Sequence, residues 1–238
     1  MTRLADEIRS DLEAAGNPDR AAAEQAYLKS ELHHFGVSVP ATRSVATATR
    51  RAQPDLSHDE LVELVERLWA EPVHECRAVC GELLVAYHDR LGPDDIDLLE
   101  RLLRESRTWA LVDGLAANVV GRLVETHPEL TDVLDQWAAD PDFWIRRSAL
   151  LALLVPLREG RGDFARFGRY ADAMLDEREF FIRKAIGWVL RDTGRRRPDL
   201  VFEWLLPRAA RASTVTLREA LKPLTDEQRA AIAAARQP

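Results

Sequence analysis

Residues 179–191 read Glu-Phe-Phe-Ile-Arg-Lys-Ala-Ile-Gly-Trp-Val-Leu-Arg, and this stretch decides the fold. Four of its apolar residues recur at helical spacing, namely Ile182, Ile186, Val189 and Leu190. That spacing predicts an amphipathic helix. Lys184 and Trp188 are four residues apart and share a different face of that helix. A large aromatic side chain beside a cation on such a face is either covered by another helix or meets a flat, charged ligand.

The same pattern occurs earlier in the chain. One copy is residues 143–150, Phe-Trp-Ile-Arg-Arg-Ser-Ala-Leu, which align without a gap with residues 180–187. A weaker match to the central residues of this pattern is Glu-Cys-Arg-Ala at 75–78. In this register four positions are equivalent, at intervals of 32, 37 and 37 residues: Arg77, Trp109, Arg146 and Arg183. Such a period is typical of helix-pair repeats. The sequence therefore predicts an all-α fold, an α-solenoid of HEAT-like antiparallel helix pairs, curved with a concave groove.

Turn and capping signals divide the chain into helices. Ser57 with Glu60, and Thr225 with Gln228, have the spacing of capping boxes. The predicted helices cover residues 3–15, 20–34, 41–52, 58–70, 73–90, 94–105, 108–125, 128–139, 143–157, 164–177, 179–193, 199–210 and 214–222, with a last one after 225. No strand pattern and no Gly-rich phosphate loop occurs. Because the connections are all short, we expect one domain over residues 1–238.

The composition is that of a helical, water-soluble protein. The chain has 238 residues, of which 46% are hydrophobic and 31% charged. No apolar run approaches the length needed to span a bilayer. The first residues form a polar amphipathic pattern instead of a signal peptide, so we expect an intracellular, cytoplasmic protein without membrane contact.

Charge is distributed unevenly along the chain. Residues 1–140 contain 14 Lys and Arg against 27 Asp and Glu, a net charge of −13. Residues 141–238 contain 19 against 13, a net charge of +6, so the total is −7. This asymmetry places a basic surface in an acidic protein, or else reflects solvated Arg-rich helices.

The cysteines predict no metal site. Cys76 and Cys80 are four residues apart on a predicted helix, where a mutual disulfide is sterically poor. His74 and His88 flank them, but the spacing matches no common zinc pattern. We interpret the two cysteines as small buried residues and expect neither a metal nor a cofactor.

If the repeats stack, several aromatic and charged side chains would face a common groove. The second helices of successive repeats line one wall of a solenoid, which would bring the following residues to a common groove: Trp109, Asp113, Arg146 or Arg147, Lys184 and Trp188, with Tyr27 from the first helix pair. Cations bind phosphate, and aromatic rings offer flat faces to bases or cations. A carboxylate repels phosphate, so it needs another role, such as stabilising a cationic sugar.

At these residues the chain resembles the AlkD family of DNA alkylation repair glycosylases, which are built from HEAT-like repeats. The matching segments are residues 26–29 with 35–37, 109–115, 142–147, 179–191 and 217–221. Phe-Ile-Arg-Lys-Ala-Ile-Gly-Trp, at 181–188, is the most specific of them. One departure is that Ser38 and Val39 follow Gly36, where the family often places polar side chains that reach the DNA.

The resemblance implies an enzyme that releases N3- and N7-alkylated purines, such as 3-methyladenine and 7-methylguanine, from double-stranded DNA. It implies no cofactor, and we expect a monomer. The roles it implies are a catalytic aspartate at Asp113, lesion-flanking tryptophans at Trp109 and Trp188, a phosphate-contacting arginine at Arg147 or Arg146, and an aromatic near the lesion at Tyr27. We add Lys184 as a DNA-binding residue because it shares the face of Trp188.

The chemistry suits a carboxylate. An N3- or N7-alkylated purine is already a cationic leaving group, so the barrier lies mainly in the developing oxocarbenium ion of deoxyribose. A nearby carboxylate stabilises that charge and orients or deprotonates water, and two indoles hold the cation. No residue has the pattern of a Schiff-base lysine, so we expect a monofunctional hydrolase that leaves an abasic site. The family acts without enclosing the base in a pocket, unlike most glycosylases.

Other interpretations remain open at this point. Asp113 is also explained as a surface carboxylate near a helix N-terminus, and the tryptophans as fillers between repeats. Arg146 and Arg183 are also explained as ladder arginines that pair with acids of neighbouring repeats. A non-catalytic protein that binds distorted DNA and a HEAT-type protein–protein scaffold are the alternative functions. The preference among alkylated purines and bulky adducts, including a role in self-resistance, is not set by the sequence.

Overall fold

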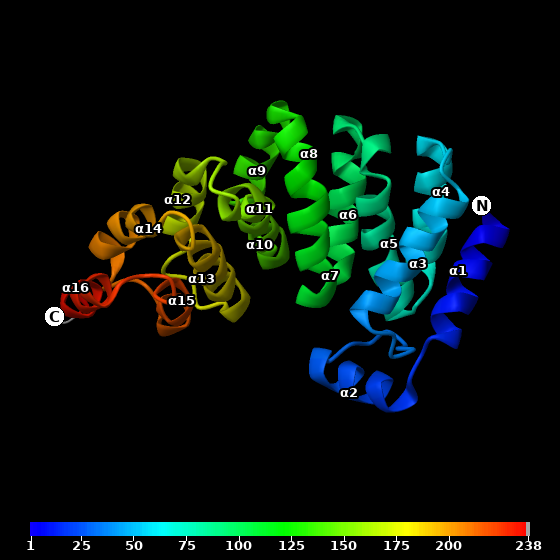
Figure 1. The fold of residues 1–238 in the computed structure, drawn as a ribbon, viewed down its shortest axis with the longest axis horizontal. Helices are drawn as coiled ribbons and strands as arrows, with labels where there is room; N and C mark the ends of the chain where they lie inside the picture. The colour runs from blue at the N-terminus through cyan, green and yellow to red at the C-terminus, as the bar shows by residue number, and fades with distance from the viewer. Residues whose placement is uncertain (237–238) are drawn as a thin grey trace. The chain divides into compact units, whose positions relative to one another are not determined.

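The computed structural model describes residues 1–236 as helices joined by short connections (Figure 1). Within these residues there is no β-strand, only an isolated bridge between His33 and Val73. The all-α prediction is confirmed. None of the described helices has the length and apolar content that crossing a membrane requires. Contacts group the chain into two compact units, one of residues 1–97 with 106–115, the other of residues 98–105 with the chain from 116 onward.

Unit 1 is a stack of helices around a leucine-rich core. Its helices are α1 (Thr2–Ala14), α2 (Pro18–Leu28), α3 (Val39–Ala52), α4 (His58–Ala70), α5 (His74–Ala86) and α7 (Trp109–Gly114), and α6 (Ile96–Ser106) begins in it. Helix α5 is central, since α1, α3, α4 and α7 all contact it. The capping box predicted at Ser57 and Glu60 opens α4 as expected.

Helix α2 is shorter than predicted and differs from its neighbours. Lys29 adopts a left-handed conformation, with φ of 51°, and ends the helix there instead of at residue 34. The helix runs crosswise to α1 and α3 (Figure 1) and has no buried residue. The chain then passes through Gly36, whose φ of +79° and close approach to Asn17 and Ala21 leave no space for a side chain.

A buried carboxylate holds the segment after α2. Glu75, on α5, accepts hydrogen bonds from the backbone N–H groups of Phe35 (2.9 Å), Gly36 (2.6 Å) and Val37 (3.1 Å). Because these amides lie in a loop, they have no helical carbonyl to bond, and the carboxylate satisfies them. Glu75 therefore fixes the approach of the chain to α3.

Unit 2 contains the rest of the helices. They are α8 (Gly121–Thr126), α9 (Thr131–Trp137), α10 (Phe143–Ala152), α11 (Leu154–Arg158), α12 (Phe164–Ala173), α13 (Phe180–Gly194), α14 (Pro198–Leu205), α15 (Thr214–Ala220) and α16 (Asp226–Ala235). Helix α13 is the centre of this unit and contacts α10, α11, α14 and α15. The capping box predicted at Thr225 and Gln228 opens α16.

Two predicted helices are interrupted. Residues 143–157 divide at Leu153 into α10 and α11, because Pro156 lacks an N–H and its ring would clash with the carbonyl of Ala152 in a continuous helix. Residues 109–126 stay helical, but Leu115–Val120 form a π-helical turn between α7 and α8. No residue pattern in the sequence indicated that turn.

The repeated arginines occupy a shared position on their helices. Arg77, Arg146 and Arg183 are each the fourth residue of α5, α10 and α13, whereas Trp109 is the first residue of α7. The predicted equivalence therefore does not extend to Trp109. Arg146 and Arg183 each donate to the carbonyl six residues earlier, Asp140 and Glu177 respectively, at 2.6 Å. Arg146 also pairs with the Glu177 carboxylate at 2.8 Å, which agrees with its interpretation as a ladder arginine, one of the two left open by the sequence.

Helices α13 and α15 approach each other at a glycine. A Cβ built on Gly187 would lie 2.8 Å from the carbonyl oxygen of Thr216 and 3.0 Å from Cβ of Glu219. Beside this contact, buried Glu219 accepts hydrogen bonds from Lys184 (2.6 Å), Lys222 (2.8 Å) and the Arg191 guanidinium. Only glycine at position 187 allows this spacing.

We expect Gly187→Ala to destabilise the protein by about 2 kcal/mol, because the methyl group meets backbone atoms that cannot rotate away. The matched control is Gly114→Ala, on an exposed helical position with nothing within 4 Å. It should stabilise the protein by about 0.5 kcal/mol through the helix propensity of alanine. Urea unfolding measures both, and equal stability of the two variants would contradict the packing account.

Glu219 should make stability depend on acid pH. The hydrogen bond from Lys184, followed by those from Lys222 and Arg191, lowers the pKa of Glu219 from 4.5 to about 2. A lowered pKa in the folded state adds stability that is complete above pH 4.5 and is lost as the pH falls toward 2. The shift corresponds to roughly 3 kcal/mol. The stability gap between wild type and Glu219→Gln should be constant above pH 5 and close between pH 4.5 and 2; a gap independent of pH would refute the assignment.

Candidate active site

One group of predicted residues lies at the start of α7, in unit 1. The buried side chain of Thr108 caps this helix by accepting a hydrogen bond from the N–H of Ala110 (3.4 Å). Leu111 and Val112 are buried and fix the helix in unit 1. Trp109 and Asp113 lie one turn apart on the other side, with Trp109 36% exposed and Asp113 half-buried. The π-helical turn begins two residues after Asp113.

Tyr27 meets this part of the site. Its ring, on α2, is 74% exposed, and its centroid lies 6.2 Å from that of Trp109 with an interplanar angle of 82°. The edge of one ring therefore faces the other, a favourable aromatic arrangement. The structure thus brings Tyr27 into contact with Trp109, and Asp113 lies one turn after Trp109 on the same helix.

A separate group of predicted residues lies on α13, in unit 2. Trp188 is half-buried, and its indole Nε1 donates to Oδ2 of Asp192 at 3.1 Å. The Asp192 carboxylate is buried and also accepts from Nε of Arg158 (2.9 Å) and Nε of Arg191 (3.1 Å). These contacts fix the orientation of the Trp188 ring. Asp192 was missed in the sequence, although its spacing from Trp188 repeats that of Asp113 from Trp109.

The predicted cations of unit 2 have partners inside the unit. The partly exposed Lys184 pairs with Glu219, and Arg146 binds the Glu177 carboxylate and the backbone before α10. Arg147 is only 2% exposed. Its guanidinium donates to the carbonyl of Phe181 and lies 5.8 Å from the centroid of that ring.

Other arginines of unit 2 are more accessible. Six of them are exposed and, within residues 1–236, their side chains have no hydrogen-bond or ion-pair partner: Arg122, Arg169, Arg178, Arg195, Arg196 and Arg218. Arg195 and Arg196 belong to the basic connection after α13. No motif in the sequence marked Arg178 or Arg218 as a functional residue, and only their charge distinguishes them. These side chains carry the uncompensated positive charge of this unit.

The cysteines are structural. Cys76 and Cys80 are free thiols buried in α5, and Cys80 Sγ lies 3.1 Å from the carbonyl oxygen of Cys76. Burial raises the pKa of Cys76 to about 12 and raises that of Cys80 well above its ordinary value. Neither thiol ionises at neutral pH, in agreement with their interpretation as small core residues.

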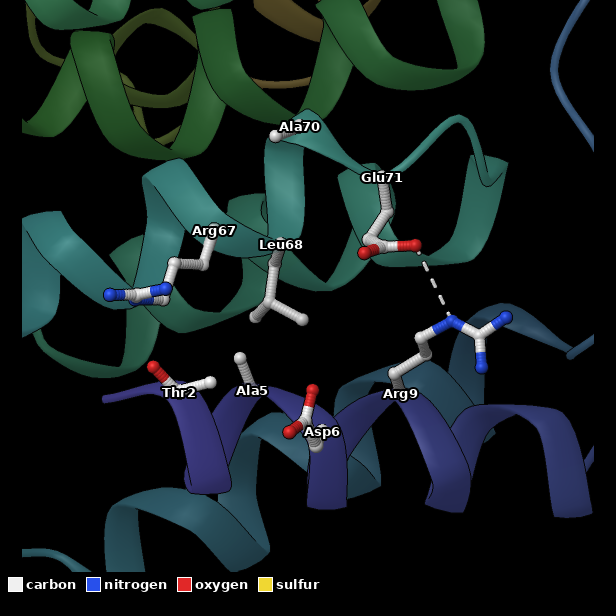
Figure 2. Close-up of a pocket in the computed structure, with 8 residues that line it drawn as sticks. All are labelled: Thr2, Ala5, Asp6, Arg9, Arg67, Leu68, Ala70 and Glu71. Atoms are coloured by element: carbon white, nitrogen blue, oxygen red, sulfur yellow. Dashed lines mark ion pairs between the residues drawn. The ribbon is translucent and has the colours of Figure 1, made fainter.

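A pocket elsewhere in unit 1 contains none of the predicted site residues. It lies between α1 and α4, has a volume of about 320 Å³, and holds an ion pair of 3.4 Å between Arg9 and Glu71 (Figure 2). Its other lining residues are Thr2, Ala5, Asp6, Arg67, Leu68 and Ala70. This pocket has no part in the candidate site.

Comparisons with known proteins identify the family. Two solved structures share the fold: a predicted DNA alkylation repair enzyme from Enterococcus faecalis (TM-score 0.79, 23% identity, 89% of this chain and 97% of that one) and AlkD2 from Streptococcus mutans (TM-score 0.62, 16% identity, 85% and 96%). A search of curated proteins found no match. The family model described as "DNA alkylation repair enzyme" matches residues 8–224. The chain therefore belongs to the DNA alkylation repair enzyme family.

Proposed function

We propose that this protein is a monofunctional DNA glycosylase, which hydrolyses the N-glycosidic bond of N3- and N7-alkylated purines in duplex DNA and leaves an abasic site. The observation that carries the proposal is the half-buried Asp113 carboxylate one turn from the exposed indole of Trp109, in a chain of this family. The proposed reaction needs no cofactor and no pocket around the base, because the alkylated base leaves without further activation.

Asp113 suits the proposed chemistry through its position. A carboxylate stabilises the oxocarbenium ion when it is held on a rigid element and only partly hydrated. Asp113 lies on a helix anchored by Leu111 and Val112, and its half-burial weakens the screening of its charge by water. From there it can also orient or deprotonate the attacking water.

The acid of the second Trp–Asp pair, Asp192, is assigned a structural role. Both acids follow a tryptophan by four residues. The charge of Asp192 is buried and compensated by Arg158 and Arg191, so it has little left to offer a substrate cation. We assign Asp192 to holding Trp188, and Asp113 to the chemistry.

The aromatic residues are proposed to contact the DNA near the lesion. Trp109 and Tyr27 present exposed ring surface from unit 1, and an indole face attracts a cationic sugar or an alkylated base. Trp188 is proposed to contribute the second indole, with its ring held by Asp192. Fixed rings bind with a small loss of conformational entropy.

The proposed phosphate contacts differ in how much rearrangement they need. Lys184 is partly exposed, and its flexible side chain can exchange Glu219 for a phosphate. Arg146 would exchange Glu177 for a phosphate in the same way. Arg147 would have to leave the Phe181 carbonyl and become exposed. Among these three we rank Lys184 first.

Asp113→Asn should keep the fold and DNA binding but reduce release of 7-methylguanine and 3-methyladenine from methylated duplex DNA at least 100-fold, on the order of the effect of removing a transition-state charge. Chromatographic quantification of the free bases measures the rate of release.

The matched variant is Asp192→Asn in the other Trp–Asp pair. It should lower the melting temperature and reduce base release much less than Asp113→Asn does, because it loosens Trp188 without removing a charge from the reacting sugar. Undiminished release by Asp113→Asn would exclude its catalytic role, and DNA binding without release by wild type would favour a non-catalytic protein.

Lys184→Gln should weaken DNA binding and lower the slope of log Kd against log salt by about 1, because one phosphate contact is lost. The control is Lys222→Gln, which removes another cation from Glu219 but is proposed to leave the DNA contacts unchanged. Fluorescence anisotropy with a duplex over 50–200 mM salt gives both slopes. Equal slopes for the two variants would show that Lys184 does not contact phosphate.

A further inference from the structure

Three potential metal ligands meet where α2, the following loop and α5 come together in unit 1. One ligand atom each from Glu24 on α2, His34 in the loop and Glu75 on α5 lie within 4.8 Å of one another. His34 is 4% exposed and Glu75 is 1% exposed. Imidazole and carboxylate groups that converge in a buried place are the donor set of many transition-metal sites.

His34 is a buried polar side chain whose ring nitrogens have no hydrogen-bond partner among the described residues. Within residues 1–236, neither its Nδ1 nor its Nε2 has a hydrogen bond, although both atoms are buried. The ring of His74 stacks on the face of His34, with centroids 4.5 Å apart and planes at 7°, and gives neither ring nitrogen of His34 a hydrogen bond. Such a group is costly to bury, so an unsatisfied histidine beside two carboxylates calls for a ligand.

The carboxylates have lone pairs to spare. Oε1 of Glu75 accepts two backbone N–H bonds, but Oε2 accepts only that of Phe35. In Glu24, Oε1 pairs with Arg20 at 2.5 Å, and the second oxygen is available. A neutral imidazole offers the lone pair of one ring nitrogen to a metal ion.

We propose that Glu24, His34 and Glu75 bind one divalent transition-metal ion of the Zn²⁺ or Mn²⁺ class, with water in the remaining coordination positions. The imidazole favours these ions over Mg²⁺ and Ca²⁺, which prefer all-oxygen ligands. The ion would balance two neighbouring carboxylates and give His34 a partner. This site is separate from the proposed catalytic residues.

The metal would fix a helix that lacks a buried face. Helix α2 has no buried residue, and its polar ties to the following segment include the N–H of Asn17 to Phe35 (2.8 Å) and Nε2 of Gln25 to Leu32 (3.0 Å). A metal bridge from Glu24 would attach α2 to α5. Tyr27 is three residues after Glu24 on the same helix, so its position against Trp109 would become more rigid.

Metal binding can be tested on the full chain after treatment with EDTA and dialysis. Calorimetric titration with Zn²⁺, and separately with Mn²⁺, should show one saturable site for at least one of the ions, whereas Mg²⁺ should give none. The bound ion should raise the melting temperature and slow tryptic cleavage at Arg20 and Lys29 on α2. Absence of a one-equivalent site for both ions would overturn the proposal.

Variants assign the ligands. Glu24→Gln, at a half-exposed helix position where folding is expected to survive, and His34→Gln should each weaken the affinity at least about 10-fold. The control is His33→Asn, which removes the adjacent exposed histidine and should leave the affinity unchanged. Wild-type affinity in Glu24→Gln would overturn the site as proposed, since the remaining binding would belong to other groups such as Cys76 and Cys80.

Discussion

Compensation of buried carboxylates is the constraint on which much of this structure depends. Glu75 accepts hydrogen bonds from three backbone amides of the loop before α3. Asp192 accepts from the indole of Trp188 and from two arginines. Glu219 accepts from three cations, which are Lys184, Lys222 and Arg191. A buried carboxylate without any partner costs several kcal/mol, so one donor can leave only where others remain, as Lys222 and Arg191 do on Glu219. Cations and indoles that donate to these buried acids are therefore held in place, and those that do not are available to a ligand.

The same constraint separates structural acids from the candidate catalytic one. Asp113 and Asp192 each follow a tryptophan by four residues, but Asp192 is buried and accepts hydrogen bonds from Arg158 and Arg191, whereas Asp113 is half-buried. Asp113 is half-buried on a helix whose apolar side is fully buried, which suits a group that must meet a transient positive charge. The positive charge of the second half of the chain is likewise divided between cations committed to Glu177, Glu219 and Asp192 and exposed ones such as Arg178.

Local signals in the sequence predicted much of the fold, but other features of the structure were not predicted from it. Helical periodicity and the capping boxes at Ser57 and Thr225 placed helices correctly. The left-handed Lys29 and the π-helical turn after Gly114 were not predicted, because no residue pattern in the sequence marks either of them. Tyr27 and Trp109 were selected from the resemblance and do meet, whereas Asp192 was overlooked despite its spacing. Glu24, His34 and Glu75 come from three elements with no motif, so only the fold brings them together.

The central claim is that this chain cleaves the N-glycosidic bond of a cationic purine. The most direct measurement is single-turnover incubation of the wild-type protein with a duplex carrying one 7-methylguanine, followed by mass spectrometry of the free base and of the DNA strand. The account predicts free 7-methylguanine in equal amount to an intact strand with an abasic site, cut only on later alkali treatment. Protein bound to the duplex with no free base, or strand cleavage without alkali, would contradict it.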